Sequence, residues 1–222
     1  MISAIAPAPS NVDVVYAGTS DGLVRVTTNG GTTWATGSGL PNRYVEHLVV
    51  DPDDARRAWA AVSGFGTGHV WVTTDGGATW ANASGNLPDV PVNALAFVAT
   101  TGALYAGTDL GMFVAGNAGA TASTGAGSTA WTPFNEGFPN VAVFALAYHA
   151  GSGTLLAGTH GRGTFARALE GVTVAVSITP AAPTTVIVGD TLALAASARD
   201  AGGAPLATSF TWTSSNPAVA SI

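Results

Sequence analysis

The chain has 222 residues, 47% of them hydrophobic and only 9% charged, with a formal net charge of −6, 29 glycines and no cysteine. The acidic balance disfavours nucleic acid and anionic membranes as partners, since both reward basic patches. The missing cysteines exclude disulfides, thiol catalysis and thiolate metal sites, and no apolar run approaches the roughly 18 residues that span a bilayer. Few charges, many glycines and abundant Val, Thr and Ala predict β-structure with tight turns.

The predicted elements begin with a strand at residues 2–6 and continue as an internal repeat. The segment Thr-Thr-Asn-Gly-Gly-Thr-Thr-Trp at 27–34 recurs 46 residues later at 73–80, with six of eight positions identical. Each copy leads to a Leu-Pro step and then to an apolar run, and a later Phe-Pro step does the same. The apolar runs are residues 44–50, 92–98 and 143–148. A period of 46 to 51 residues in short strands indicates a repeat architecture.

Each repeat reads as four short strands separated by Gly- and Asp-containing turns. In the third repeat these are residues 93–99, 103–107, 112–115 and a strand that starts near Trp131. No segment has sustained helical periodicity, so no helix is predicted. Four strands in about 45–50 residues are typical of a β-propeller blade. The fold class predicted for residues 1–170 is therefore all-β, a partial propeller of about three and a half four-stranded blades.

The repeated segment resembles the Asp-box (BNR repeat) of sialidases, xyloglucanases, sortilin-type receptors and a photosystem assembly factor. The resemblance implies a hairpin turn between the third and outermost strands of a blade, away from the active face. Asn29 and Asp75 would accept backbone N–H bonds across the turn, and the glycine pairs would supply positive φ. The tryptophans would cover the blade-to-blade interface. The structural box residues are Asn29, Gly30, Gly31, Trp34, Asp75, Gly76, Gly77 and Trp80.

A carboxylate beside glycines is also a possible calcium ligand, but one turn offers too few oxygens and Asn29 removes one charge. We therefore predict no metal site and no cofactor. In the third repeat a small-residue insertion at 115–130 replaces the box, and a long mobile loop is expected there. The fourth repeat has its first three strands, without a box or a fourth strand.

Residues 171–222 follow a different pattern, with alternating strands expected at 172–180, 188–194 and 210–220 and an inward Trp212. The phrases Val-Gly-Asp-Thr-Leu and Trp-Thr-Ser-Ser-Asn-Pro resemble the group 2 bacterial Ig-like domain of intimin and invasin stalks. The resemblance implies the N-terminal part of an Ig-like β-sandwich, with poorly covered side chains at Leu192, Leu194 and Trp212. We expect a fragment of a longer bacterial secreted or cell-surface protein, whose signal peptide and missing blades lie outside this sequence.

Catalytic constellations are not evident in the sequence. A sialidase needs three arginines around the substrate carboxylate, and the seven arginines present do not suggest such a triad. A xyloglucanase-type site needs two facing carboxylates, for which Asp21 and Asp109 are candidates, but their equivalent positions after Gly-Thr favour a repeated turn role. No catalytic residue is predicted. The candidates for a ligand-binding face around the central channel are Asp21, Arg43, His69, Asp109, His160 and Arg162, the alternative being solvated side chains on glycine-rich turns.

These observations favour a non-catalytic extracellular propeller that binds a glycan or another extracellular protein, without nucleic acid or membrane insertion. A different hypothesis is a fragment of a sialidase-like or xyloglucanase-like glycoside hydrolase whose catalytic residues lie partly in missing blades. A third is a structural surface array without a ligand.

Overall fold

The computed structural model describes residues 1–116, 129–169, 173–179, 193–200, 204–206 and 209–213. The chain divides into two compact units. The first consists of Met1–Ala150 with Thr154–Arg167, and the second of Gly151–Gly153 with Ala168–Ile222. Among the described residues, no helix is long and apolar enough to cross a membrane.

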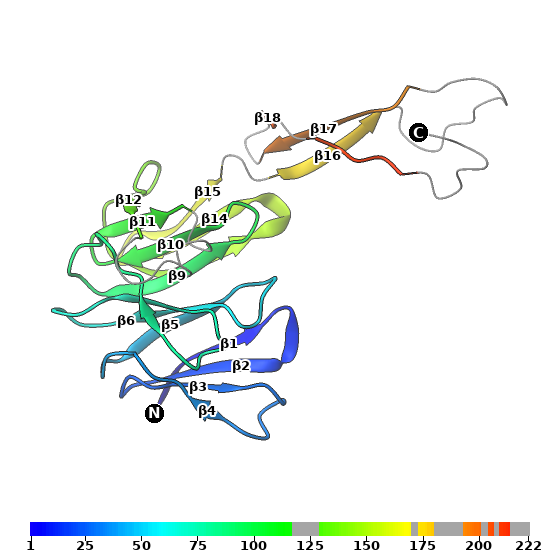
Figure 1. The fold of residues 1–222 in the computed structure, drawn as a ribbon. Coiled ribbons are helices and arrows are strands. Elements are labelled where there is room, and N and C mark those ends of the chain that lie inside the picture. The colour runs from blue at the N-terminus through cyan, green and yellow to red at the C-terminus, as the bar shows by residue number, and fades with distance from the viewer. Residues whose placement is uncertain (117–128, 170–172, 180–192, 201–203, 207–208, 214–222) are drawn as a thin grey trace. The chain divides into compact units, whose positions relative to one another are not determined.

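The first unit contains four antiparallel sheets, each formed by strands consecutive in the chain (Figure 1). Blade one consists of β1 (Ile2–Ala8), β2 (Asn11–Thr19), β3 (Val24–Thr27) and β4 (Ala35–Thr36). Blade two consists of β5 (Val45–Val50), β6 (Ala58–Val62), β7 (Val70–Thr73) and β8 (Ala81–Asn82). Blade three consists of β9 (Val92–Val98), β10 (Ala103–Thr108), β11 (Gly111–Ala115) and β12 (Trp131–Pro133). Blade four consists of β13 (Val143–His149), β14 (Thr154–Thr159) and β15 (Gly163–Ala168).

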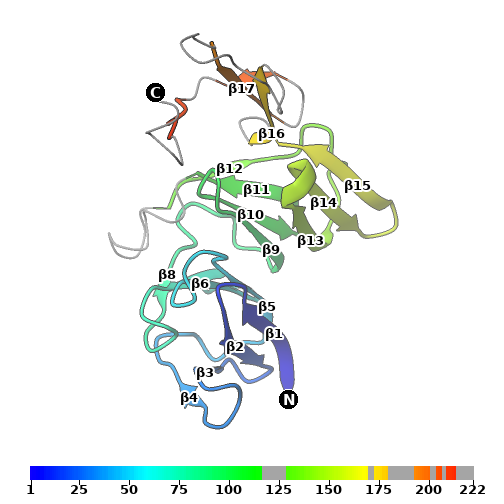
Figure 2. The same cartoon turned by 90° about the vertical axis from the view of Figure 1, so that its right-hand side faces the viewer.

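The blades follow one another in chain order, as Figures 1 and 2 show, and their first strands β1, β5, β9 and β13 contact each other in sequence. This is the arrangement of a β-propeller, whose innermost strands line the axis. The partial propeller predicted from the repeat is confirmed, including a fourth blade of three strands. The only helical element among the described residues is one 3-10 turn, η1 (Ala150–Ser152).

Because successive side chains of a strand point to opposite faces of its sheet, each sheet presents apolar side chains to the neighbouring sheet. Between blades one and two, the Tyr16 ring meets the Trp80 ring edge-on at a centroid distance of 6.4 Å. The Tyr16 hydroxyl donates to the Ala55 carbonyl at 2.8 Å, and burial raises the pKa of Tyr16 to about 12. Between blades two and three, the Trp59 and Phe97 rings stack at 4.4 Å. One large aromatic pair therefore anchors each of these interfaces.

The two box turns have the hydrogen bonds that the motif predicts. Asn29 Oδ1 accepts from the Thr33 backbone N–H at 2.9 Å, and Asp75 Oδ1 accepts from that of Thr79 at 3.0 Å. Burial alone would raise the pKa of the Asp75 carboxyl, but hydrogen bonds from Thr79, Thr73 and the backbone lower it. The four box glycines, Gly30, Gly31, Gly76 and Gly77, all have φ between 64° and 92°.

The second box also docks blade two onto blade one. The Ser38 carbonyl accepts from the Trp80 backbone N–H at 2.9 Å, and a Cβ added at Gly77 would lie 2.5 Å from Cγ2 of Val26. Trp80 is 5% exposed, as expected for an interface residue, whereas Trp34 is 44% exposed. The expectation that the box tryptophan covers an interface therefore agrees with Trp80, whereas no described blade lies against Trp34 and its role stays a prediction.

The second unit contains a three-stranded antiparallel sheet of β16 (Thr173–Thr179), β17 (Ala195–Asp200) and β18 (Pro205–Leu206). β16 matches the first strand expected there, and β17 was not predicted. Most of the strand expected at 188–194 and residues 214–220 of the next one lie outside the described residues, as do the loop at 117–128 and Leu192. Leu194 is exposed and Trp212 half-buried. Residues 210–213 form no strand, and an Ig-like domain remains a prediction.

Candidate functional site

Consecutive antiparallel strands place alternate connections at the same end of every blade. One end, here called the loop end, therefore carries the second-to-third-strand loops and the linkers between blades. The loops are 20–23, 63–69, 109–110 and 160–162, and the linkers are 37–44, 83–91 and 134–142. All six predicted ligand-face residues occupy these segments. The box turns lie at the opposite end, here called the box end.

Five of the six candidates are exposed at the loop end: Asp21, Arg43, Asp109, His160 and Arg162. Arg43 lies beside two of the loops, one through its backbone and the other through its side chain. A Cβ added at Gly22, beside Asp21, would lie 2.5 Å from the Arg43 backbone N, and one added at Gly64 would lie 3.7 Å from Arg43 Nε. A hydrogen bond from the Thr19 hydroxyl and one from its own backbone lower the pKa of the Asp21 carboxyl. Asp21 and Arg43 are thus close neighbours on one surface.

Asp109 lies where blades two, three and four meet. Its Oδ1 accepts from Asn93 Nδ2 at 2.9 Å, and the same amide donates to the Val143 carbonyl at 3.3 Å. Glu46, on β5, is a second carboxyl in this region. Burial raises the pKa of Glu46, a hydrogen bond from Ser63 opposes this, and the Asp109 charge raises it further. Glu46 was not predicted as a site residue, because its position in an apolar run gave no turn or motif signal.

His160 lies at the start of the loop of blade four. Its backbone N–H donates to the Ala142 carbonyl at 2.9 Å, and its ring meets that of Phe144 edge-on at a centroid distance of 5.8 Å. Both rings are exposed, and Arg162 follows on the same loop. The aromatic face, imidazole and guanidinium together are chemically suited to hydrogen bonding and stacking against a ligand.

His69 differs from the other candidates because its side chain is only 2% exposed. Its Nε2 lies 2.9 Å from Asp89 Oδ1, and both Asp89 oxygens accept from the Gly66 backbone N–H. Hydrogen bonds from Gly66 and then His69 lower the pKa of the Asp89 carboxyl. A groove of about 350 Å³ borders the pair. His69 therefore holds the loop 63–69 together and does not belong to the exposed group predicted around the channel.

Asp89 was missed by the sequence reasoning, although a signal was present. It follows Leu-Pro in the linker, and Asn42 and Asn140 follow Leu-Pro and Phe-Pro at the same position. A Cβ added at Gly22 would lie 2.8 Å from Asn42 Cα, and one added at Gly111 would lie 3.1 Å from Asn140 Oδ1. The repeated Asn or Asp of each linker thus packs beside the second-to-third-strand loop of the blade that precedes the linker. This is a structural role.

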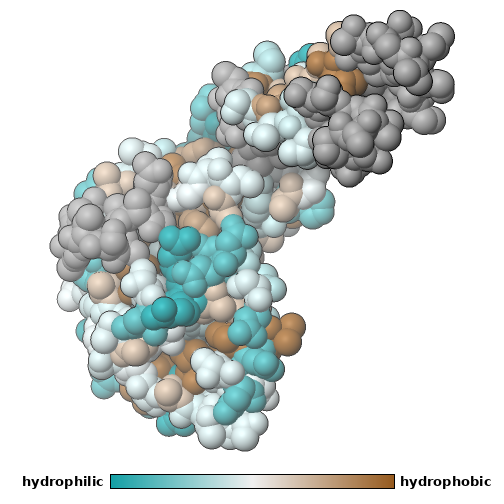
Figure 3. Space-filling model, turned by 45° about the vertical axis from the view of Figure 1, so that its right-hand side comes forward, coloured by the Kyte–Doolittle hydropathy of each residue, from teal (hydrophilic) through white to brown (hydrophobic). Residues whose placement is uncertain are grey.

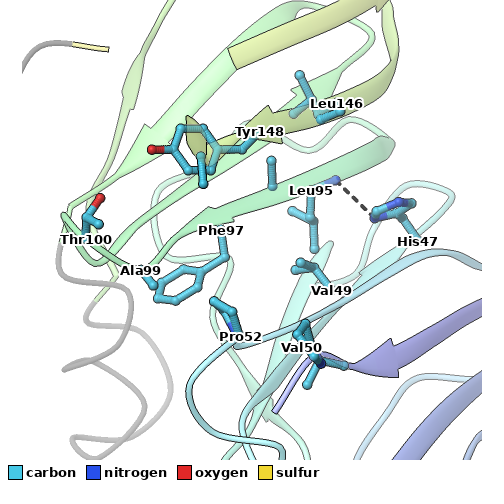
Figure 4. Close-up of a pocket in the computed structure, with 14 residues that line it drawn as sticks. His47, Val49, Val50, Pro52, Leu95, Phe97, Ala99, Thr100, Leu146 and Tyr148 are labelled. Carbon is cyan, nitrogen blue, oxygen red and sulfur yellow. Dashed lines mark hydrogen bonds between the residues drawn. The ribbon is translucent and has the colours of Figure 1, made fainter. Parts of the chain in front are cut away.

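A largely apolar groove of about 390 Å³ lies between the first strands of blades two, three and four (Figure 4). Its lining includes Leu95, Phe97 and Leu146, with His47 and Tyr148 as polar groups. His47 Nδ1 accepts from the Leu95 backbone N–H at 3.4 Å. The Tyr148 hydroxyl is buried and has no hydrogen-bond partner among the described residues. The groove also borders turns of the box end, and none of the six predicted ligand-face residues lines it.

Burial lowers the pKa of His47 below its ordinary value of 6.5. The unfolded chain therefore binds a proton at this site more readily than the folded chain, and stability falls as pH decreases through 6.5 toward the lower folded value. We expect the free energy of unfolding to fall less between pH 7.5 and pH 5 in His47→Gln, whose amide still accepts a hydrogen bond but does not titrate. Urea denaturation at both pH values measures this. Equal pH dependence in the two proteins would contradict it.

Comparisons with known proteins identify the fold but no family. Neither a comparison with protein families nor one with curated proteins gives a match. Among solved structures, an ancestral GH74 enzyme aligns with a TM-score of 0.56 and 16% identity over 74% of this chain and 22% of its own. The GH74 xyloglucanase from Xanthomonas campestris gives 0.53 and 20% identity over 70% and 26%. The β-propeller domain of Cps50 from Myceliophteria thermophila gives 0.54 and 13% over 72% and 50%.

The structural alignments establish a shared propeller fold, and sequence identities this low do not transfer a function. The chain spans about a quarter of each GH74 enzyme and half of the Cps50 propeller domain.

Proposed function

We propose that the chain is a non-catalytic, extracellular binding module that recognises a glycan or another extracellular protein through its loop end. The observation that carries this is the position of five exposed polar side chains, from three blades and one linker, at the same end of the blades: Asp21, Arg43, Asp109, His160 and Arg162. Loops held by a rigid set of sheets are common positions for binding residues. The low charge and the resemblance of residues 171–222 to bacterial stalk modules support a secreted or cell-surface protein.

The carboxylates at the loop end support binding over catalysis. Asp89 is held by Gly66 and His69, and Asp109 by Asn93. An acid or base of a glycosidase must instead face its partner across the scissile bond. The carboxylates held by these contacts organise their own loops, which is a structural contribution to a binding surface.

A glycoside hydrolase fragment is the alternative, and one observation favours it. Glu46, whose carboxyl pKa is raised by burial, experiences the charge of Asp109. A carboxyl whose pKa is raised by burial and by a neighbouring carboxylate is a feature of general acids in glycoside hydrolases. The solved GH74 enzymes share the fold only, and further catalytic residues would then lie in missing blades.

Mixing a xyloglucan oligosaccharide with the full chain tests both the binding module and the glycoside hydrolase alternative. We expect calorimetry to detect binding without release of reducing ends, and Arg43→Ala and His160→Ala to weaken the affinity by about 1 kcal/mol or more each through lost hydrogen bonds. Arg56→Ala is the matched control, because Arg56 is an exposed arginine at the box end.

Two results would contradict this proposal. One is equal weakening by Arg56→Ala. The other is hydrolysis that disappears in Glu46→Gln, which would favour the alternative. If this oligosaccharide does not bind, the same variants are compared on a glycan array and on immobilised extracellular proteins, and absence of binding on both would favour the structural array.

A further inference from the structure

The loop of blade two is held differently from the corresponding loops of the other three blades. In those blades the second strand ends on a threonine whose hydroxyl donates to a carbonyl at the far end of a short loop. The pairs are Thr19–Leu23, Thr108–Gly111 and Thr159–Gly163. In blade two the register places Val62 at this position, since it pairs with Val45 as Thr108 pairs with Val92. Valine has no hydroxyl, and the loop 63–69 is the longest of the four.

The linker after blade two supplies the missing support through Asp89, which accepts from His69 Nε2. A carboxylate only accepts, so Nε2 donates and Nδ1 of the neutral ring is left as an acceptor. Nδ1 is buried without a partner among the described residues, which is unfavourable. The corresponding residues of the other linkers, Asn42 and Asn140, carry no charge. Blade two thus departs from its own repeat at a cost, and such departures are typical of functional positions.

The groove of about 350 Å³ that borders this pair presents unused hydrogen-bonding groups. In addition to its structural role, Asp89 is 59% exposed, and its oxygens have a lone pair left after accepting from Gly66 and His69. Asn82 also lines the groove, and its Nδ2 donor has no partner in the described part of the chain. Only glycine at position 68 leaves room for this amide, because an added Cβ would lie 2.4 Å from Nδ2.

The charge of the groove favours a neutral ligand. Among the described residues no arginine lines it, and the sequence contains no lysine, so an anion would meet Asp89 without a counter-charge. Only 9% of the residues are charged, and much of the face drawn in Figure 3 is of intermediate hydropathy. A carboxylate and an amide suit two adjacent hydroxyls, one donating to the carboxylate and one accepting from the amide.

An exposed aromatic ring belongs to the same loop. Phe65 precedes Gly66, which lines the groove, and Phe65 is 61% exposed. An aromatic face offers an apolar surface that the C–H groups of a sugar ring can cover. Hydroxyl-binding groups beside an exposed ring are therefore the combination that a sugar requires.

We propose that the groove between the loop 63–69 and the linker 83–91 is a sugar-binding subsite for a neutral glycan. Asp89 accepts from one sugar hydroxyl, Asn82 Nδ2 donates to a neighbouring one, and the Phe65 ring packs on the apolar face of the sugar. All three residues belong to blade two and its linker, which described blades flank on both sides. The inference rests on the binding role proposed for the loop end and narrows its ligand to a neutral glycan.

An array of neutral and acidic oligosaccharides, including the xyloglucan oligosaccharide named above, is first probed with the full chain. Calorimetry then measures the affinity for the neutral oligosaccharide that binds best. Asp89→Asn should weaken it at least about fivefold, because a neutral amide oxygen accepts more weakly than a carboxylate. Asparagine is compatible with the fold there, since Asn42 and Asn140 hold this position in the other linkers. Asp53→Asn is the matched control, because Asp53 is an exposed carboxylate at the box end of blade two.

The aromatic contact is tested in the same way. Phe65→Ala should weaken the affinity at least about fivefold, whereas Phe65→Tyr keeps the ring and should bind like the unmodified chain. The pair separates packing on the sugar from a change in the loop backbone.

The proposal is overturned if no neutral glycan binds, if acidic glycans bind more tightly, or if Asp89→Asn and Phe65→Ala leave the affinity unchanged. Weakening by Arg43→Ala and His160→Ala alone would support the binding role of the loop end and place the glycan elsewhere on it. A tri-lysine peptide that binds the unmodified chain but not Asp89→Asn, with no glycan bound, would identify a cationic partner instead.

Discussion

Replacing Trp80 with alanine is expected to reduce the free energy of unfolding by about 3–5 kcal/mol, the usual cost of removing a buried tryptophan. Trp80 is almost fully buried between blades one and two, where its ring meets Tyr16. The cavity left by the ring would border the apolar cluster of Tyr16, Val26 and Leu48. Because β-strands hold these residues in place, the cavity would close only partly. Urea denaturation followed by fluorescence measures the loss.

Trp34→Ala is the internal control, because Trp34 holds the same box position in blade one. Its ring is 44% exposed, and we expect a loss below about 1 kcal/mol. Equal losses in the two variants would show that the box tryptophan stabilises its own turn and that the blade interface adds nothing.

The two tryptophans show what a motif predicts and what it leaves open. The box segment specifies a local hairpin, and its hydrogen bonds and positive φ angles followed from the residues alone. Burial of the tryptophan depends on a neighbouring blade, which is information outside the motif. The strands of blade three were likewise predictable within about one residue, because alternation and turn residues are local signals.

Arg57→Ala is the second large-effect change, with an expected loss of about 3 kcal/mol. Asp51 is 1% exposed, and its Oδ2 accepts from Arg57 Nε at 2.7 Å. The guanidinium also lies 5.9 Å from the ring centroids of Trp59 and Phe97. Removing it leaves a buried carboxylate without this charge partner and reduces packing at the interface of blades two and three.

Arg56→Ala is the neighbouring control, and this exposed side chain should change stability by no more than about 0.5 kcal/mol. Adding Asp51→Asn to Arg57→Ala should restore part of the loss, because the buried charge is then absent. If the double variant is less stable than Arg57→Ala alone, lost packing and not the unpaired carboxylate dominates.

Arg57 and His69 mark the limit of prediction at single residues. The aspartates before Arg57 and the glycines before His69 predict surface turns and do not indicate a partner for either side chain. Their partners Asp51 and Asp89 lie 6 and 20 residues away, and the pairing depends on how each loop folds back. Asp109 of blade three acts on Glu46 of blade two, and three blades line the groove beside His47. Neither arrangement follows from the sequence until the sheets are assembled. In the second unit, β17 lacked the strong alternation of apolar and polar residues that identifies a strand.

The two blade interfaces use equivalent positions: an aromatic residue on the second strand, a leucine on the first strand of the next blade, and a tryptophan beside its outer strand. These are Tyr16, Leu48 and Trp80 in one interface and Trp59, Leu95 and Trp131 in the other. Because adjacent blades meet through equivalent positions, duplication of one blade's coding sequence would add a unit that already fits its neighbours. Deletion of a blade would bring two compatible sides together in the same way. Repeat proteins whose units contact only their neighbours tolerate such changes in number. Evolution could thus lengthen or shorten this chain by whole blades without inventing a new contact.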